Sequence, residues 1–396
     1  MRKILFLAVS ATLLAAGCQK TEIINPIGDQ PALSFSTDFG KLTKAADANA
    51  EGLVNLKEQD FRVWAYAAHD FDNTPQDDVT AIGIYDKMED IKVVDDNNAW
   101  DPGKQYFWPG ANKGLYFFAV SDTDEFLGNV GKPENETKVS PVTINMTNSV
   151  DGNNVSVANP TNMVITNYVV DENNPNNDLM VADFVRQSQE DNEKKVSLNF
   201  RHTLSKVQFQ FVTNPVEDIS VFVQKLEVVD LLTTGNLTVT PADFTADATG
   251  AEVATVSFVW DLLGDAADET PVTATFVDDY DTAYDGTDFP AKIEGATPTD
   301  EDKKAMKITA TGGENDPAQE FATWLVLPQD ITDKTVKITY LINERKFTNE
   351  FALDKTLEAW AVNQYVKYTI NLSPNLITFD ASVEEWTPTT VVDHQN

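Results

Sequence analysis

A length of 396 residues predicts two or three domains, and a hydrophobic fraction of 42% is enough to build their cores. The formal net charge of −34 excludes a nucleic-acid partner, because binding nucleic acid needs a basic face. The charge instead predicts a solvated acidic surface.

Residues 1–18 have the pattern of an export signal. Two basic residues precede an apolar run, Ile4–Ala16, that is too short to cross a bilayer as a helix. The run leads to Ala-Ala-Gly and then Cys18, the only cysteine of the chain. This arrangement resembles a bacterial lipoprotein signal, which is removed before the cysteine, and the cysteine is then acylated. We therefore expect Cys18 to anchor the precursor in a membrane through lipid, and we expect no disulfides.

The stretch from Leu33 to Phe39 predicts the first strand of the fold. Residues for a buried side alternate with polar residues along this stretch, and a period of two residues is typical of a half-buried strand. A basic and small-residue segment follows, in which a trypsin-like protease could cut between Lys44 and Ala45, with Lys41 as a second candidate. The sequence therefore predicts a strand that proteolysis can separate from the rest of the chain.

Short strand-like runs separated by turn residues continue to the C-terminus. They are residues 61–67, 79–85, 114–121, 139–146, 163–169, 178–184, 196–200, 203–212, 221–229, 237–240, 253–260, 272–277, 305–311, 323–327, 336–342, 347–353, 365–372 and 377–386. The asparagine-rich segment 145–177 favours long surface loops around one or two short strands, one of them at 163–169. Leu357–Ala361 favours a helical turn. This pattern predicts an all-β protein made of β-sandwiches.

The polar stretch Gln187–Lys195 has no hydrophobic period and predicts a domain boundary. We therefore expect four parts along the chain. They are a signal peptide at 1–18, a propeptide with the first strand at 19–44, an N-terminal β-sandwich at 45–190, and a C-terminal β-sandwich at 191–396.

Residues for catalysis, metal binding or cofactor binding form no recognisable motif in the sequence. The three histidines, His69, His202 and His394, are far apart, and no zinc, calcium-loop or serine-hydrolase spacing is present. His202 lies at a strand edge and is more typical of a structural histidine than of a catalytic one. We therefore expect no enzyme, no metal and no cofactor, although 63 acidic residues leave chance carboxylate pairs open.

Taken together, several motifs resemble the FimA-type fimbrillins, which are the subunits of the type V pili of Bacteroidales. The motifs are the cysteine of the signal, Phe61-Arg-Val-Trp-Ala-Tyr, Trp100 with Tyr106-Phe-Trp-Pro, Leu115-Tyr-Phe-Phe-Ala, Asp178-Leu-Met-Val-Ala-Asp, Leu198-Asn-Phe-Arg-His-Thr-Leu-Ser-Lys-Val and Ile377-Thr-Phe-Asp-Ala-Ser-Val-Glu-Glu-Trp. Their order and spacing together carry the resemblance.

The resemblance implies two tandem transthyretin-like β-sandwich domains and a surface fimbria that supports adhesion. It implies an outer-membrane lipoprotein precursor, a trypsin-like surface protease that removes the first strand, and a neighbouring subunit whose C-terminal segment fills the emptied groove. Lys44-Ala45 fits the expected cut of a basic before a small residue, although the best-known members have arginine there.

Two C-terminal segments could act as the donor strand. Ile377, Phe379 and Val383 alternate as the first strand does, but the C-terminal domain itself could need them. The later segment Val383–Val392 contains Val391, and Pro388 weakens it because proline cannot donate to a ladder. Either segment would produce a head-to-tail contact with other copies or related pilins, and hence an open filament.

Other roles for the chain stay open at this point. A tip or membrane-anchor fimbrillin is the close variant of a shaft subunit, and a host glycan or protein is the expected adhesion ligand. A surface glycan-binding lipoprotein is the second hypothesis. It would use Trp100, Tyr106, Phe107 and Trp108 as a sugar-stacking platform, but aromatic residues at strand spacing are more often core.

Overall fold

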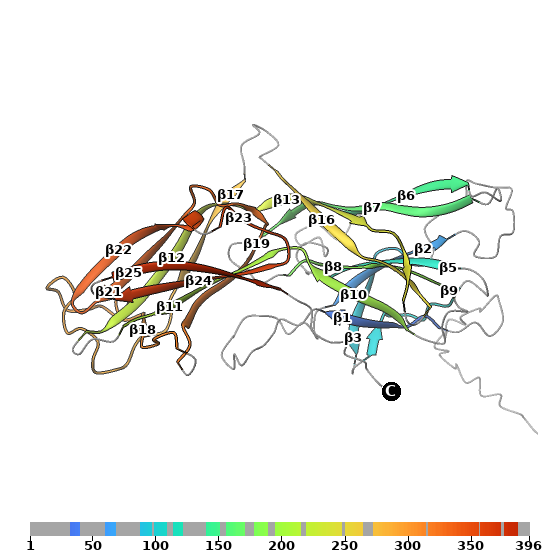
Figure 1. Ribbon diagram of the computed structural model, residues 1–396. Helices are drawn as coiled ribbons and strands as arrows, with labels where there is room; N and C mark the ends of the chain where they lie inside the picture. The colour runs from blue at the N-terminus through green and yellow to red at the C-terminus, as the bar shows by residue number, and fades with distance from the viewer. Residues whose placement is uncertain are drawn as a thin grey trace, which may run out of the picture.

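The computed structural model describes residues 32–39, 60–68, 88–96, 99–108, 114–121, 140–150, 156–170, 178–188, 195–214, 219–247, 250–263, 272–313, 316–355, 357–373 and 376–386. These residues form β-strands almost throughout, with a short 3-10 helix at η2 (Leu353–Lys355). The prediction of an all-β protein is confirmed. The strands form two lobes that lie side by side (Figure 1).

The right-hand lobe in Figure 1, here called the N-lobe, consists of a large sheet and a smaller one. The large sheet contains β1 (Phe35–Phe39), β2 (Phe61–Ala68), β3 (Ile91–Asp96), β4 (Ala99–Asp101), β5 (Gly114–Ser121), β8 (Met180–Ala182), β9 (Phe184–Ser188), β10 (Val196–His202), β14 (Thr245–Ala246) and β15 (Glu252–Ala254). Its main path is β1-β10-β8-β5-β2-β3-β4, and β9 joins β5 to β15 and β14. The smaller sheet, in the order β16-β13-β7-β6, contains β6 (Val142–Val150), β7 (Ser156–Val169), β13 (Thr234–Pro241) and β16 (Val256–Leu262).

The large sheet is buried on both faces, which explains its nearly continuous hydrophobic strands. All eight residues of β5 are buried. Tyr116 and Phe118 belong to the core shared with the smaller sheet, whereas Leu115 and Phe117 belong to a second core on the opposite face. We call this second core, which also contains Phe61 and its buried neighbours, the outer core. The alternation within one strand thus supplies two separate hydrophobic layers.

The left-hand lobe in Figure 1, the C-lobe, is a second β-sandwich. One sheet, in the order β19-β11-β24-β25, contains β11 (Ser205–Val212), β19 (Gln319–Val326), β24 (Gln364–Ser373) and β25 (Leu376–Glu385). The other, in the order β17-β12-β21-β22 with β18 beside β12, contains β12 (Val221–Leu232), β17 (Thr273–Asp279), β18 (Met306–Ile308), β21 (Thr335–Ile342) and β22 (Arg345–Ala352). A separate two-stranded pair consists of β20 (Gln329–Asp330) and β23 (Ala359–Trp360).

The lobes do not divide the chain at residue 190, where the polar stretch predicted a boundary. β10 follows that position but pairs with β1 and β8 of the N-lobe. β13 and β16, which lie between two C-lobe strands in sequence, pair with β7 and with each other in the N-lobe. The strand pairing therefore places residues 195–202 and 234–262 with the N-terminal strands, since sheet partners and not linker composition decide where a lobe ends.

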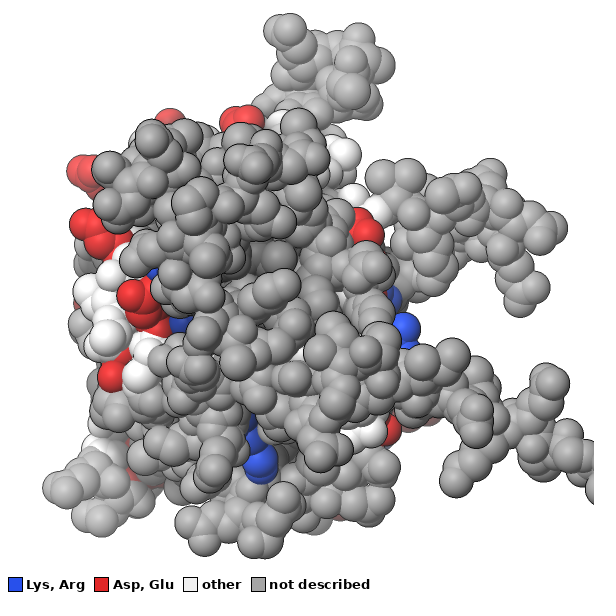
Figure 2. All heavy atoms as spheres, turned by 90° about the vertical axis from the view of Figure 1, so that its right-hand side faces the viewer, with Lys and Arg blue, Asp and Glu red and all other residues white. Residues whose placement is uncertain are grey.

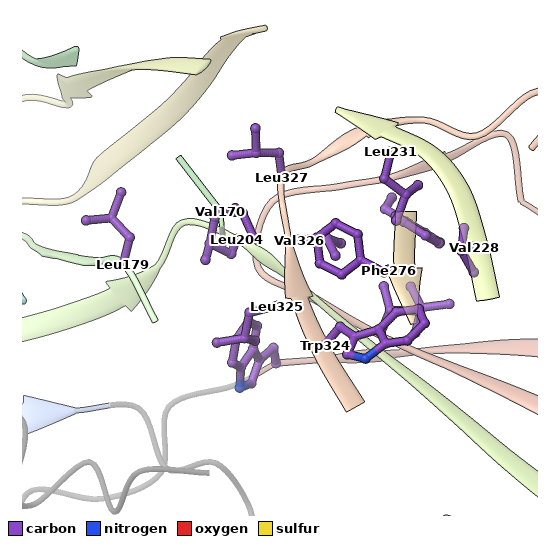
Figure 3. Packing of buried hydrophobic residues seen from close by; sticks show 14 of the residues in the cluster. Val170, Leu179, Leu204, Val228, Leu231, Phe276, Trp324, Leu325, Val326 and Leu327 are labelled. Carbon is purple, nitrogen blue, oxygen red and sulfur yellow. The ribbon is translucent and has the colours of Figure 1, made fainter. Parts of the chain in front are cut away.

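One hydrophobic core continues from one lobe into the other. Figure 3 shows Val170, Leu179 and Leu204 at the junction, near Leu325 and Leu327 of the C-lobe. All of these side chains belong to a single cluster of buried residues. The junction is therefore packed in the manner of a protein interior.

The strand expected at 163–169 in the asparagine-rich segment is confirmed as part of β7, but β7 is longer than expected. It forms a hairpin with β6, because Met163 and Ile165 keep one face buried while the asparagines of β7 lie on more exposed positions. The expected helical turn at Leu357–Ala361 is instead the short strand β23, and the 3-10 helix precedes it. The strand expected at 79–85 lies outside the described residues.

The end of the N-lobe carries acidic side chains along one margin, while basic side chains appear at separate places (Figure 2). The surface visible for the described residues thus agrees with the net charge of −34. Within the part of the chain that the structure describes, no helix is long and apolar enough to cross a membrane.

Candidate functional site

The predicted first strand is β1, which lies at an edge of the large sheet (Figure 1). It runs parallel to β10, with Phe35 opposite Val196 and Phe39 opposite Phe200. The Val196 amide donates a 2.8 Å hydrogen bond to the Ser34 carbonyl. Among the described residues, β10 is the one strand that pairs with β1. Removing β1 would therefore leave the backbone groups of β10 on that side without their strand partner.

Alternate side chains of this segment fill the outer core. Leu33, Phe35 and Thr37 are only 6%, 3% and 5% exposed, whereas the residues between them are exposed or half-buried. The Phe35 ring lies edge-on at 6.0 Å from the Phe61 ring and 6.2 Å from the Phe117 ring. Burying each of the two large apolar side chains stabilises the lobe by roughly 1.5–3 kcal/mol. We call the surface that β1 covers, formed by β10 and these aromatic rings, the β1 site.

The aromatic residues considered as a sugar platform belong to the same core. Trp100, Tyr106 and Trp108 are buried, and Phe107 is half-buried. The Trp100 ring packs 5.1 Å from Phe61, and the Tyr106 carbonyl accepts a 2.8 Å hydrogen bond from the amide of Leu33. The interpretation as core packing is confirmed, since these rings wall the β1 site rather than face solvent.

A buried carboxylate holds β10, the strand beside β1, in place. Asp183 is 2% exposed and accepts hydrogen bonds from Arg201 at 2.7 and 3.0 Å and from the Asn199 amide at 2.7 Å. It also accepts a 3.1 Å hydrogen bond from the backbone of Val256 on β16. The hydrogen bond and charge of Asp183 raise the pKa of Arg201. One side chain thus ties β10 to the second sheet of the lobe.

The predicted donor residues of the C-terminus lie on β25, which completes the C-lobe. β25 pairs with β24 along its whole length. Phe379 is 7% exposed, and its ring stacks on Phe351 and Tyr368. Ile377 is half-buried, while Val383 is 42% exposed. The structure therefore places Phe379 in the core of its own lobe, away from the β1 site.

His202 is a buried residue at the junction between the lobes. Its Nδ1 lies 2.6 Å from an Asp178 carboxylate oxygen, and its ring stacks on Trp386 at a centroid distance of 3.7 Å and an interplanar angle of 8°. His202 and Trp386 are only 1% and 3% exposed. These contacts give His202 a packing role, joining the end of β10 to the residue that follows β25.

The remaining predicted site residues, Cys18, Lys44, Ala45 and Val391, lie outside the described residues. Across the ranges that are described, no group of three or more histidine, cysteine, aspartate or glutamate side chains is arranged to hold a metal ion.

Sequence reasoning missed the roles of Asp183 and Trp386. Both residues stand inside motifs that carried the family resemblance, but their partners come from distant parts of the chain. The signal available for Asp183 was an acidic residue between the apolar runs of β8 and β9, since a buried charge needs a partner. Trp386 carried no comparable signal.

The partly buried carboxyl group of Asp278 should make the stability of the C-lobe depend on pH. Burial of Asp278 on β17, together with Asp279 and Asp281, raises the pKa of Asp278 from 3.8 to about 6. The stability that the protonated form provides is fully present below pH 3.8 and is lost as the pH rises through about 6. We therefore expect Asp278→Asn to raise the melting temperature at pH 7 and to leave it unchanged at pH 3.5. Melting curves at both pH values measure this, and an equal gain at both would contradict it.

The chain is similar to one known protein family and to several solved structures. A sequence model described as fimbrillin-like matches residues 43–386. A fimbrial protein from Bacteroides vulgatus has a TM-score of 0.49 at 15% identity, covering 90% of this chain and 99% of its own. A candidate cell adhesion protein from Bacteroides ovatus has a TM-score of 0.43 at 11% identity, covering 91% and 99%. A fimbrial assembly protein from Parabacteroides distasonis has a TM-score of 0.34 at 8% identity, covering 90% and 99%.

No curated protein matches the chain. The match of the fimbrillin-like sequence model extends over most of the 396 residues, from the segment that follows β1 to Trp386. It covers both lobes and the strands that wall the β1 site. The chain therefore belongs to the fimbrillin-like family.

Proposed function

We propose that this protein is a subunit of a surface pilus that assembles by replacement of β1. The placement of β1 carries the proposal, because this edge strand buries Phe35, Leu33 is buried just before it, and Lys41 and Lys44 follow it in the sequence. A cut between Lys44 and Ala45 separates the strand from the chain. The β1 site then offers unpaired backbone groups beside apolar side chains, which is the arrangement that accepts an added strand.

The incoming strand comes from the C-terminal segment of another copy or of a related pilin. Phe379 belongs to the core of its own lobe, which favours the later segment, Val383–Val392 with Val391, as the donor. Within that segment, Val383 pairs with Val366 and Trp386 is buried, so the part after Trp386 is the part that inserts. The contact joins unlike surfaces of successive subunits and therefore propagates as an open, head-to-tail filament.

The precursor in this proposal is an outer-membrane lipoprotein acylated at Cys18, and a trypsin-like surface protease starts assembly. We assign the protein to the shaft of the fimbria, which supports adhesion to a host glycan or protein. An anchor subunit would keep β1 and its lipid, and a tip subunit would lack a usable donor segment.

Replacing both Lys41 and Lys44 with glutamine is expected to keep β1 attached, because a trypsin-like protease needs a basic residue at the cut. The variant should stay in the membrane fraction as a full-length lipoprotein and be absent from sheared filaments. N-terminal sequencing of sheared protein from the unmodified strain should begin at Ala45. Normal filaments from the double variant would show that the cut lies elsewhere, and a lipidated Cys18 on sheared protein would favour an anchor.

A further inference from the structure

The smaller sheet of the N-lobe ends at β6, an edge strand of nine residues. Among the described residues, β7 is the one strand that pairs with β6. The Asn145 carbonyl faces β7, where it accepts a 3.0 Å hydrogen bond from the Thr161 hydroxyl. Successive residues of a strand direct their backbone groups to opposite sides, so those of Ile144 and Met146 point to the open edge. β6 therefore offers a row of backbone donors and acceptors to an added strand.

β6 lacks the features that usually protect an edge strand. Its sequence, Val-Thr-Ile-Asn-Met-Thr-Asn-Ser-Val, contains no charged residue and no proline. The bulge in its pairing with β7 results from one extra residue on β7, Thr161, so β6 itself stays regular. Every other described edge strand of five or more residues carries an acidic residue. These strands are β1, β16, β17, β19, β22 and β25, with Asp38, Asp261, Asp278, Glu320, Glu350 and Asp380.

The region without charge extends from this edge into the sheet. β7 and β13, the next two strands, also contain no charged residue, although the chain carries a net charge of −34. Two copies of such a chain repel each other wherever their carboxylates come close. Contact through one of the acidic edges would place like charges side by side, which destabilises a strand pair. Contact through β6 avoids this repulsion.

The side chains of β6 indicate the kind of strand that fits beside it. Thr143, Asn145 and Thr147 are exposed on the outer face of the sheet, whereas Ile144 and Met146 are half-buried at the rim of the core. A suitable partner strand is uncharged and alternates polar outer with apolar inner side chains, so that its apolar residues cover Ile144 and Met146. β6 itself has this pattern. A second copy, turned by a two-fold rotation perpendicular to the sheet, places polar beside polar and apolar beside apolar side chains.

We propose that β6 is a docking edge for β6 of a second copy of this chain, and that the two strands pair antiparallel across a two-fold axis. The pair joins the two smaller sheets into one, in which the order β16-β13-β7-β6 continues in reverse through the partner. Both copies use the same edge, so the contact is complete at the dimer. It lies on a different sheet from the β1 site, and the pairing of two chains does not need β1 to leave.

In a filament assembled as proposed above, the same edge joins two filaments side by side. Every subunit presents a β6 edge, so many weak contacts act together along the two filaments. β6 runs along the long axis of the molecule (Figure 1), and an antiparallel pair reverses that axis. Two paired subunits therefore point in opposite directions, and so do their filaments. This step rests on the proposed function, whereas the pairing of two separate chains does not.

The test follows association of the full chain with Cys18→Ser, which removes the predicted lipidation site, by sedimentation velocity from micromolar to millimolar concentration. This chain should show a monomer–dimer equilibrium. Asn145→Asp keeps the shape of the side chain but places a carboxylate on β6 of both copies, and it should weaken dimerisation about tenfold. The control is Asn349→Asp on β22, which adds the same charge at an exposed position of another edge and should leave dimerisation unchanged. Melting curves check that each variant folds.

A monomer at every concentration, or equal weakening by Asn145→Asp and Asn349→Asp, would overturn the pairing through β6. A second measurement adds Thr143→Cys, Asn145→Cys or Thr147→Cys to the Cys18→Ser chain, and the three variants are oxidised mildly, each alone and in mixtures. Disulfide-linked dimers should form faster than with Asn349→Cys. Equal rates would show random collision and contradict the pairing.

Electron microscopy of cells tests the step from dimer to filament. Filaments of the unmodified strain should lie side by side, and filaments of the Asn145→Asp strain should have normal length and lie apart. Filaments that lie side by side in both strains would overturn the role of β6 between filaments. Absence of filaments from both strains would overturn the proposed function and leave the dimer of the purified chain standing.

Discussion

Phe35→Ala is expected to lower the free energy of unfolding of the full chain by about 3–5 kcal/mol. The Phe35 ring is 3% exposed and packs edge-on against Phe61 and Phe117, so its removal leaves a cavity in the outer core that the rigid sheet cannot close. Urea denaturation followed by tryptophan fluorescence measures the loss, because Trp108 packs against Phe117 beside the cavity.

Ser36→Ala is the matched control for this prediction. Ser36 lies on the same strand, is half-buried and faces away from the outer core, so we expect a change within about 0.5 kcal/mol. If Phe35→Ala and Ser36→Ala have the same stability, β1 does not contribute to the core as its burial indicates, and the proposed assembly site loses its physical basis.

Asp183→Ala is expected to destabilise the protein by a similar amount, about 3–5 kcal/mol, because it leaves Arg201 without its carboxylate partner. The same change removes the acceptor for Asn199 and for the backbone N–H of Val256. Since these groups belong to β10 and β16, the two sheets of the N-lobe lose a common point of attachment. Thermal and urea denaturation measure the effect.

An exposed ion pair provides the comparison for Asp183. Glu301 lies 3.0 Å from Lys304, with side-chain exposures of 79% and 40%. Water screens such a pair, and we expect no measurable loss of stability from Glu301→Ala. Equal effects of Asp183→Ala and Glu301→Ala would show that the buried network does not hold β10 in place.

Strands whose evidence is local could be predicted from the sequence. The alternation of Leu33, Phe35 and Thr37 gave the first strand and its buried face, and the apolar run at 114–121 gave the strand β5. The burial of Trp100 and Trp108 also followed from their spacing. In each case the side-chain pattern within a few residues determines which face is buried.

The pairing of distant strands could not be predicted in this way. β13 and β16 have ordinary strand patterns, and nothing in those patterns states that their partner is β7 rather than β12 or β17. His202 contacts Trp386, although the two residues come from different motifs and lie 184 positions apart in the sequence. The polar stretch Gln187–Lys195 predicted a boundary, but its first two residues, Gln187 and Ser188, are buried at the end of β9, and β10 after it belongs to the same sheet as β9.

The exchange of chain segments between the lobes has a mechanical consequence. The chain passes between them at residues 203–204, at residue 233 and between residues 263 and 272. A tensile load applied between the β1 site and Trp386 is therefore carried by several covalent crossings as well as by the packed junction. Because β10 continues into β11, the load also acts along the strands, and their cross-strand hydrogen bonds resist it together in shear rather than breaking one at a time.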